Sequence, residues 1–280
     1  MDKFINNRKI TALWTCAVYG IICCTAAGCT RSGNKTSPSA APATASDTTD
    51  SQPSTAPMDT SATSDEATTN GSLIDIDVII QDELESGCEI YAAVMLLHHY
   101  NYNVDEFTLT QDYLPVSPTY FGYDGNYYGP DMNSAFAGEP VLGYGAYAPV
   151  LERTINDYLA DQETTYSAVV EKGITLDNLC NKYIDAEDPV MVWITTDMEL
   201  PEDYVTWTVD FADENAVTEP GDDFSWPINQ HCVLLTGFDS ENFYFADSLE
   251  GTITCYDREQ CEKVFEAIGS QAVALQHQEN

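Results

Sequence analysis

The sequence has few basic residues. Only 10 of its 280 residues are lysine or arginine, against 46 aspartates and glutamates, which gives a formal net charge of −36. Such a surface repels nucleic acid phosphates and anionic lipid headgroups, so we do not expect a nucleic acid partner. The charge is typical of a soluble extracellular domain or of a protein that meets cationic partners.

The sequence also lacks the cysteine spacing of a zinc site. None of its nine cysteines forms a C-x-x-C pair, and no cluster of cysteine and histidine is present. We therefore expect neither a metal ion nor another cofactor. Cys180, Cys232, Cys255 and Cys261 are expected to be free buried thiols, with a Cys255–Cys261 disulfide as the alternative.

The first 28 residues have the features of an export signal. A basic start is followed by a mostly apolar run at 10–27, and three small residues come directly before Cys29. Small residues followed by cysteine resemble the bacterial lipobox, which implies that Cys29 is lipidated and becomes the mature N-terminus. The alternative is an uncleaved signal anchor, because about 18 residues approach the length of a membrane span. Both predictions place the rest of the chain outside the cytoplasm, on the extracellular face of the membrane.

Residues 29–72 are predicted to be a disordered linker. They are rich in Ser, Thr, Ala, Pro and Asp and contain no aromatic residue. Such a segment buries too little apolar surface to offset the entropy cost of ordering. About 40 extended residues reach on the order of 130 Å, enough to hold a domain away from a membrane.

Residues 73–280 are predicted to form one mixed domain of about 200 residues, an ordinary size for a single core. Hydrophobic periodicity predicts both element types. The expected strands are 74–80, 189–196, 231–238, 243–247, 251–256 and 272–275, with 204–209 as a further candidate, and the expected helices are 88–100, 146–158, 175–183 and 260–269. The Tyr- and Gly-rich segment 113–145 is expected to be irregular, and either lines a cleft or covers the core.

A cysteine begins the first expected helix. A polar approach containing Gly87 ends at Cys88, and an apolar run follows at once. A thiol in the first turn of a helix lies near unpaired backbone N–H groups and the positive end of the helix dipole, and both favour the thiolate. Because the thiolate is the nucleophilic form, we predict that Cys88 attacks carbonyl groups.

The base for this nucleophile follows by elimination, because the sequence has only four histidines. His98 and His99 lie on the same expected helix as Cys88, about 15 Å along its axis, too far for proton transfer. His277 lies in the polar C-terminal tail. His231, on an apolar strand, is therefore the predicted base, and its alternative is a core histidine with satisfied hydrogen bonds.

Asp247 ends the strand that follows the His231 strand across a turn at 239–242. Pairing outward from that turn places both residues at the same end of one hairpin, with their side chains on one face if the register is even. Asp247 is then predicted to accept a hydrogen bond from His231 and fix its tautomer. A turn-capping aspartate is the alternative.

Gln81 is the candidate oxyanion donor. Its side-chain amide lies a few residues before Cys88 and is predicted to join the backbone N–H of Cys88 in stabilising developing negative charge. Asn229 and Gln230 are alternatives for a polar role near His231, and Gln81 has the further alternative of an ordinary polar residue after a strand.

Six ordered blocks between residues 75 and 275 resemble the C39-like peptidase (C39_2) domains of bacterial secreted and lipid-anchored proteins. They are ELESGCE at 83–89, YGAYAPV at 144–150, PVMVW at 189–193, HCVLLTGFD at 231–239, FADSL at 245–249 and FEAIGSQAV at 265–273. The resemblance implies a papain-like α+β fold, in which a helix with the catalytic cysteine packs on an antiparallel sheet that carries histidine and aspartate. The family's triad falls on Cys88, His231 and Asp247.

We therefore expect an extracytoplasmic, membrane-tethered cysteine peptidase that hydrolyses peptide or isopeptide bonds, with cell-wall peptide among its candidate substrates. One alternative is a transpeptidase or an amidase that acts on cell-wall peptides, the transpeptidase using an amine acceptor in place of water. The other alternative is a non-catalytic surface module that keeps the fold and presents segment 113–145 to a wall polymer or protein.

Overall fold

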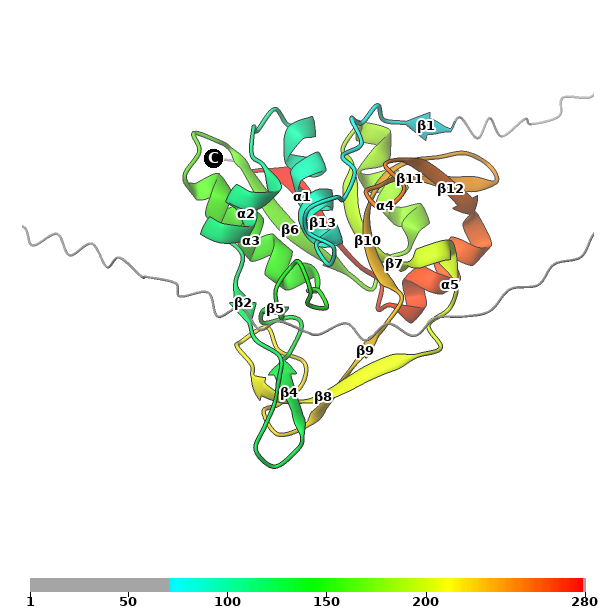
Figure 1. Ribbon diagram of the computed structural model, residues 1–280. Helices are drawn as coiled ribbons and strands as arrows, with labels where there is room; N and C mark the ends of the chain where they lie inside the picture. The colour runs from blue at the N-terminus through cyan, green and yellow to red at the C-terminus, as the bar shows by residue number, and fades with distance from the viewer. Residues whose placement is uncertain (1–70, 279–280) are drawn as a thin grey trace, which may run out of the picture. The chain divides into compact units, whose positions relative to one another are not determined.

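The computed structural model describes residues 71–278, which form a mixed α+β fold around a seven-stranded sheet (Figure 1). The strand order is β12-β11-β10-β7-β13-β6, with β1 paired to β10, and every pair is antiparallel. The strands are β1 Ser72–Leu73, β6 Tyr166–Lys172, β7 Val190–Thr195, β10 Gln230–Phe238, β11 Asn242–Asp247, β12 Thr252–Asp257 and β13 Gln271–His277. The predicted fold class, a cysteine helix packed on an antiparallel sheet, is confirmed.

Helices cover both faces of this sheet (Figure 1). The helices are α1 Cys88–His99, α2 Glu106–Asp112, α3 Ala148–Ala160, α4 Leu176–Lys182 and α5 Arg258–Ala267, with short 3-10 turns at Ile184–Ala186 and Thr196–Met198. Side chains alternate along β10, so Cys232 and Leu234 pack in the cluster with α1 and α3, whereas Val233 and Leu235 pack with α4 and α5. Two hydrophobic clusters therefore share one central sheet.

Helix α1 is buried over most of its length in the first cluster. Every residue from Cys88 to Leu97 is buried. Its N-cap is Gly87, where an added Cβ would lie 2.8 Å from the Cβ of Leu84, so only glycine permits this tight entry to the helix. The carbonyl of Gly87 accepts from the N–H groups of Ile90 and Tyr91. This entry places the Cys88 side chain inside the protein.

A smaller four-stranded sheet, with the order β3-β4-β8-β9, lies beyond the end of β10 (Figure 1). Its strands are β3 Tyr120–Phe121, β4 Tyr127–Pro130, β8 Tyr204–Phe211 and β9 Asp223–Pro227, and a separate parallel pair joins β2 Val116–Ser117 to β5 Phe136–Ala137. Segment 113–145 thus contributes short strands and buried aromatic side chains such as Phe136. It covers part of the core, and two of its residues, Gly143 and Tyr144, also line the cavity described below.

The expected strand at 74–80 is wrong. Only Ser72 and Leu73 pair with β10, and the last contact of that kind is the N–H of Ile74 with the carbonyl of Thr236. The rest of that edge of β10, from Gln230 to Leu235, is already paired with β7. The alternating pattern is real, since Ile74 is buried and Asp75 exposed, but no unpaired stretch of this edge of β10 remains for it.

Candidate active site

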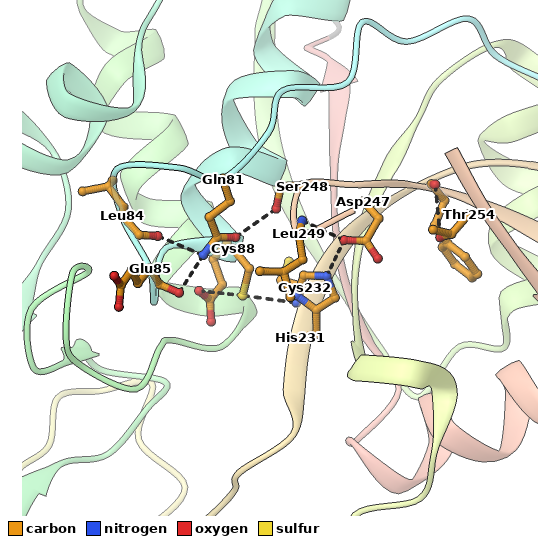
Figure 2. A network of polar contacts seen from close by, with 12 residues as sticks. Gln81, Leu84, Glu85, Cys88, His231, Cys232, Asp247, Ser248, Leu249 and Thr254 are labelled. Carbon is orange, nitrogen blue, oxygen red and sulfur yellow. Dashed lines mark hydrogen bonds and ion pairs between the residues drawn. The ribbon is translucent and has the colours of Figure 1, made fainter. Parts of the chain in front are cut away.

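Cys88 lies at the start of α1, with its sulfur against the middle of the large sheet (Figure 2). The backbone N–H of Cys232 on β10 donates to Cys88 Sγ at 3.4 Å. As the first residue of the helix, Cys88 has a backbone N–H without an intrahelical acceptor. The helix start therefore offers both a sulfur nucleophile and a hydrogen-bond donor.

His231 and Asp247 form a buried pair beside this sulfur (Figure 2). His231 Nε2 lies 2.8 Å from Asp247 Oδ1, which also accepts from the N–H of Leu249 at 3.0 Å. The register that pairs Leu234 with Ala246 brings the two side chains to one face, as the hairpin predicted. Because Nε2 is bound to Asp247, Nδ1 is the ring nitrogen left for proton exchange with Cys88.

The environment of Asp247 keeps this carboxyl ionised. Burial acts to raise the pKa of Asp247, but the hydrogen bond and charge of His231 and the N–H groups of Leu249 and Glu250 outweigh it. The pKa of Asp247 therefore lies below its ordinary value. A charged Asp247 can orient His231 and stabilise its protonated form.

A cavity of about 320 Å³ opens on both Cys88 and His231. Much of its wall is apolar or aromatic. The apolar and aromatic lining residues are Tyr144, Val205, Trp226, Ile228 and Leu249. The side-chain amide of Gln230, which is buried and has no hydrogen-bond partner within the described residues, also lines this cavity. The site therefore has space for a peptide group and an apolar side chain beside the sulfur.

Gln81 also lines the cavity, but its side-chain amide forms hydrogen bonds with neighbouring residues of the protein (Figure 2). Its Nε2 donates to the carbonyls of Leu84 and Glu85, each at 2.8 Å, and its Oε1 accepts from Ser248 Oγ at 3.0 Å. Both amide hydrogens are thus engaged. In this arrangement Gln81 fastens the approach to Cys88 against the loop after Asp247.

We expect Gln81→Ala to destabilise the protein by about 1–2 kcal/mol, because two backbone carbonyls and a hydroxyl lose their partner. If Gln81 only holds the loop in place, its replacement should lower kcat by less than about tenfold. Loss of an oxyanion donor lowers kcat by about 10²–10³-fold. Urea unfolding and steady-state kinetics separate the two. A large loss of kcat at unchanged stability would favour the oxyanion role predicted from the sequence.

Glu89 has no role in the sequence-based prediction, yet its carboxyl group lies as close to the Cys88 sulfur as the N–H of Cys232 does, at 3.4 Å. Glu89 is fully buried, and the Cys88 thiol donates to its Oε2 at 3.4 Å. The N–H of Ala146 donates to its Oε1 at 3.0 Å. A carboxylate directly after a cysteine, inside an otherwise apolar run, is the signal that could have identified it.

Burial and Glu89 together oppose the effect of the helix terminus on the thiol. Burial raises the pKa of Cys88 well above its ordinary value, the charge of Glu89 raises it further, and the N–H of Cys232 lowers it only in part. Burial also raises the pKa of Glu89 to about 7, against the opposing hydrogen bond from Ala146. The sequence predicted a thiolate favoured by the helix start, but desolvation outweighs the dipole here.

The remaining predictions concern features away from this cavity. Cys180, Cys232 and Cys261 are buried free thiols as expected, whereas Cys255 is free but exposed, so the prediction that it is buried is wrong. Between residues 71 and 278, no group of three or more His, Cys, Asp or Glu side chains is placed to hold a metal ion, and no helix has the length and apolar content needed to cross a bilayer. Cys29, the export signal and nearly all of the predicted linker lie outside the described residues.

Comparison with known proteins gives consistent results. The family described as "Peptidase_C39 like family" matches residues 73–273. An uncharacterized protein of Bacillus subtilis, YvpB, is 26% identical over 214 residues, which cover 74% of this chain and 77% of that protein. A crystal structure from Bacillus anthracis, described as that of a C39-like peptidase, superposes with a TM-score of 0.60 at 26% identity and covers 75% of this chain and 99% of that one.

Proposed function

Because the chain belongs to the peptidase C39-like family, we propose that it is a cysteine peptidase in which Cys88 attacks the carbonyl carbon of a peptide or isopeptide bond. The observation that carries this proposal is the shared cavity. It is lined by both Cys88 and His231, and His231 is held from behind by Asp247. Cys88, His231 and Asp247 thus correspond to the nucleophile, the base and the orienting carboxylate that acyl transfer requires.

In the proposed reaction, His231 Nδ1 takes the proton of Cys88 as the sulfur bonds to the substrate carbonyl carbon. The carbonyl oxygen becomes an oxyanion and accepts a hydrogen bond from the backbone N–H of Cys88. His231 then gives its proton to the leaving amine as the C–N bond breaks, which leaves a thioester on Cys88. Water, deprotonated by His231, hydrolyses the thioester and restores the thiol.

Gln81 remains a candidate second oxyanion donor within this proposal. Its Nε2 would have to release the carbonyl of Leu84 or Glu85 to reach a substrate oxygen. The backbone N–H of Cys88 needs no such change, so we assign it the larger share of oxyanion stabilisation.

The cavity lining supports a preference for an apolar side chain next to the scissile bond. Ile228 is 64% exposed at its rim, and the ring of Trp226 is buried in its wall. An apolar side chain that covers Ile228 would remove apolar surface from water on both partners. The proposed substrates are therefore peptides or isopeptides with an aliphatic or aromatic residue next to the scissile bond.

The site of action is proposed from the N-terminal sequence. A basic start, an apolar run and small residues before Cys29 support export, lipidation at Cys29 and attachment to the extracellular face of the membrane through the linker at 29–72. Cells fed a fatty-acid probe should label the wild-type chain but not Cys29→Ala. A mature protein that retains Met1 and no label would contradict this localisation.

The activity itself is tested by incubating the full chain with a peptide library and identifying new termini by mass spectrometry. We expect cleavage beside aliphatic or aromatic residues, and covalent capture of a peptide with a C-terminal electrophile on Cys88. If Cys88→Ala binds the same peptides as the wild type and the wild type cleaves none of them, the chain is a binding module instead.

A further inference from the structure

Glu89 is a buried carboxyl group without a countercharge. It has no exposed surface, and none of the ion pairs between residues 71 and 278 includes it. Its two oxygens have one partner each, the N–H of Ala146 and the thiol of Cys88. A buried carboxylate with so few donors is costly, whereas the protonated acid is not.

The surrounding chain is shaped to hold this carboxyl in place. Gly145 has a φ of +153°, and a Cβ there would lie 2.5 Å from Glu89 Oε1. The next peptide group is fixed from the other side, because Trp193 Nε1 on β7 donates to the carbonyl of Ala146 at 2.8 Å. Segments from α1, β7 and the loop before α3 thus surround the carboxyl group of Glu89, and the sulfur of Cys88 lies against one of its two oxygens.

The titratable groups that face Glu89 are all acids. Cys88 is its neighbour on α1, Cys232 faces it from β10, and Tyr147 faces it from the start of α3. The cation that the reaction requires, protonated His231, is paired with Asp247. Among residues 71–278, no neighbouring positive charge therefore favours ionisation of Glu89, and burial raises its pKa to about 7.

Resting on the nucleophilic role of Cys88, we propose that Glu89 is a positioning residue that works in its protonated form, donating its O–H to the Cys88 thiolate. In that state the proton of Cys88 is on His231, and Glu89 keeps its own proton throughout the reaction. When Glu89 ionises, the direction of the hydrogen bond reverses. The carboxylate then accepts the S–H of Cys88 and holds the thiol in its unreactive form.

This arrangement predicts an unusual pH dependence for Cys88. An ordinary thiol reacts faster with an alkylating agent as the pH rises, because more thiolate forms. Here the reactive population should decline as Glu89 ionises, so the alkylation rate of Cys88 should pass through a maximum near neutral pH. With a pKa of about 7, only about one tenth of Glu89 is protonated at pH 8.

The test is the rate of iodoacetamide alkylation of Cys88 in the full chain between pH 5 and 9, with the modified peptide identified by mass spectrometry. Glu89→Gln is isosteric. Its Oε1 can accept from Ala146 while its amide donates to sulfur at every pH. We expect this variant to react about tenfold faster than the wild type at pH 8 and to lose the alkaline decline. Glu83→Gln removes an exposed charge on the same approach segment and should leave the wild-type profile unchanged.

Two outcomes would overturn the proposal. One is a Glu89→Gln profile that superposes on the wild type, which would make Glu89 a structural residue only. The other needs no variant: a wild-type rate that rises steadily from pH 5 to 9. Alkylation requires no substrate, so a wild-type maximum without peptide cleavage would retain the role of Glu89 and refute the peptidase.

Discussion

Replacement of Cys88 with alanine is expected to slow peptide cleavage by the full chain by at least about 10³-fold, or about 4 kcal/mol in the activation barrier. Without the sulfur no thioester forms, and the cavity retains only the binding of substrate and the backbone N–H. The fold should persist, because α1 keeps its apolar contacts and loses one buried sulfur. Initial rates on the best library peptide, with circular dichroism as the check on folding, measure both effects.

The matched control is Cys255→Ala. Cys255 is a free thiol on β12, but it is exposed and does not line the cavity. Its replacement should leave the cleavage rate within about twofold of the wild type, as expected for a surface substitution. Equal losses in the two variants would show that the measured cleavage comes from something other than Cys88.

A second variant tests whether Cys88 and His231 act as a unit. Residues that share one step are strongly non-additive, so His231→Ala in the Cys88→Ala background should cost little more activity. On its own, His231→Ala should reduce cleavage by about 10²–10⁴-fold, the usual contribution of a general base. If the two losses multiplied in the double variant, His231 would act in a step that does not involve the Cys88 proton.

The sequence predicted the parts of the site that depend on local patterns. The apolar run behind Cys88 predicts α1, and apolar segments on both sides of the turn at 239–242 predict the hairpin β10–β11. The hairpin predicts that His231 and Asp247 lie close together, and the structure places His231 Nε2 2.8 Å from Asp247 Oδ1. Elimination among four histidines supplied the rest of the assignment.

The parts that escaped prediction depend on contacts between distant segments. The acceptor partners of Gln81 are carbonyls whose orientation is set by the folded approach to Cys88. Glu89 gains its role from Ala146, 57 residues away in the sequence, and from the absence of a Cβ at Gly145. The thiol pKa follows the depth of burial, which a helix-terminus argument does not include.

Glu89 should also make the folded protein less stable as the pH rises from about 4.5 to 7. Its pKa is raised from 4.5 to about 7 by burial, so in this window the native state binds more protons than the unfolded state. Stability then falls with increasing pH, because deprotonation is easier in the unfolded chain. A shift of this size corresponds to about 3 kcal/mol in the free energy of unfolding.

Glu89→Gln removes that titration and retains the shape of the side chain. Between pH 4.5 and pH 8, the free energy of unfolding measured in urea should therefore fall by about 3 kcal/mol more in the wild type than in the variant. Comparing the two proteins cancels the other acids, including Asp247, whose lowered pKa affects stability only at more acidic pH. Parallel curves for the two proteins over this range would mean that Glu89 has the same pKa in the native and the unfolded state, and is therefore ionised in the native protein at neutral pH. A buried anion beside Cys88 would then require a positive partner, and His231 is the residue of the cavity that could supply one.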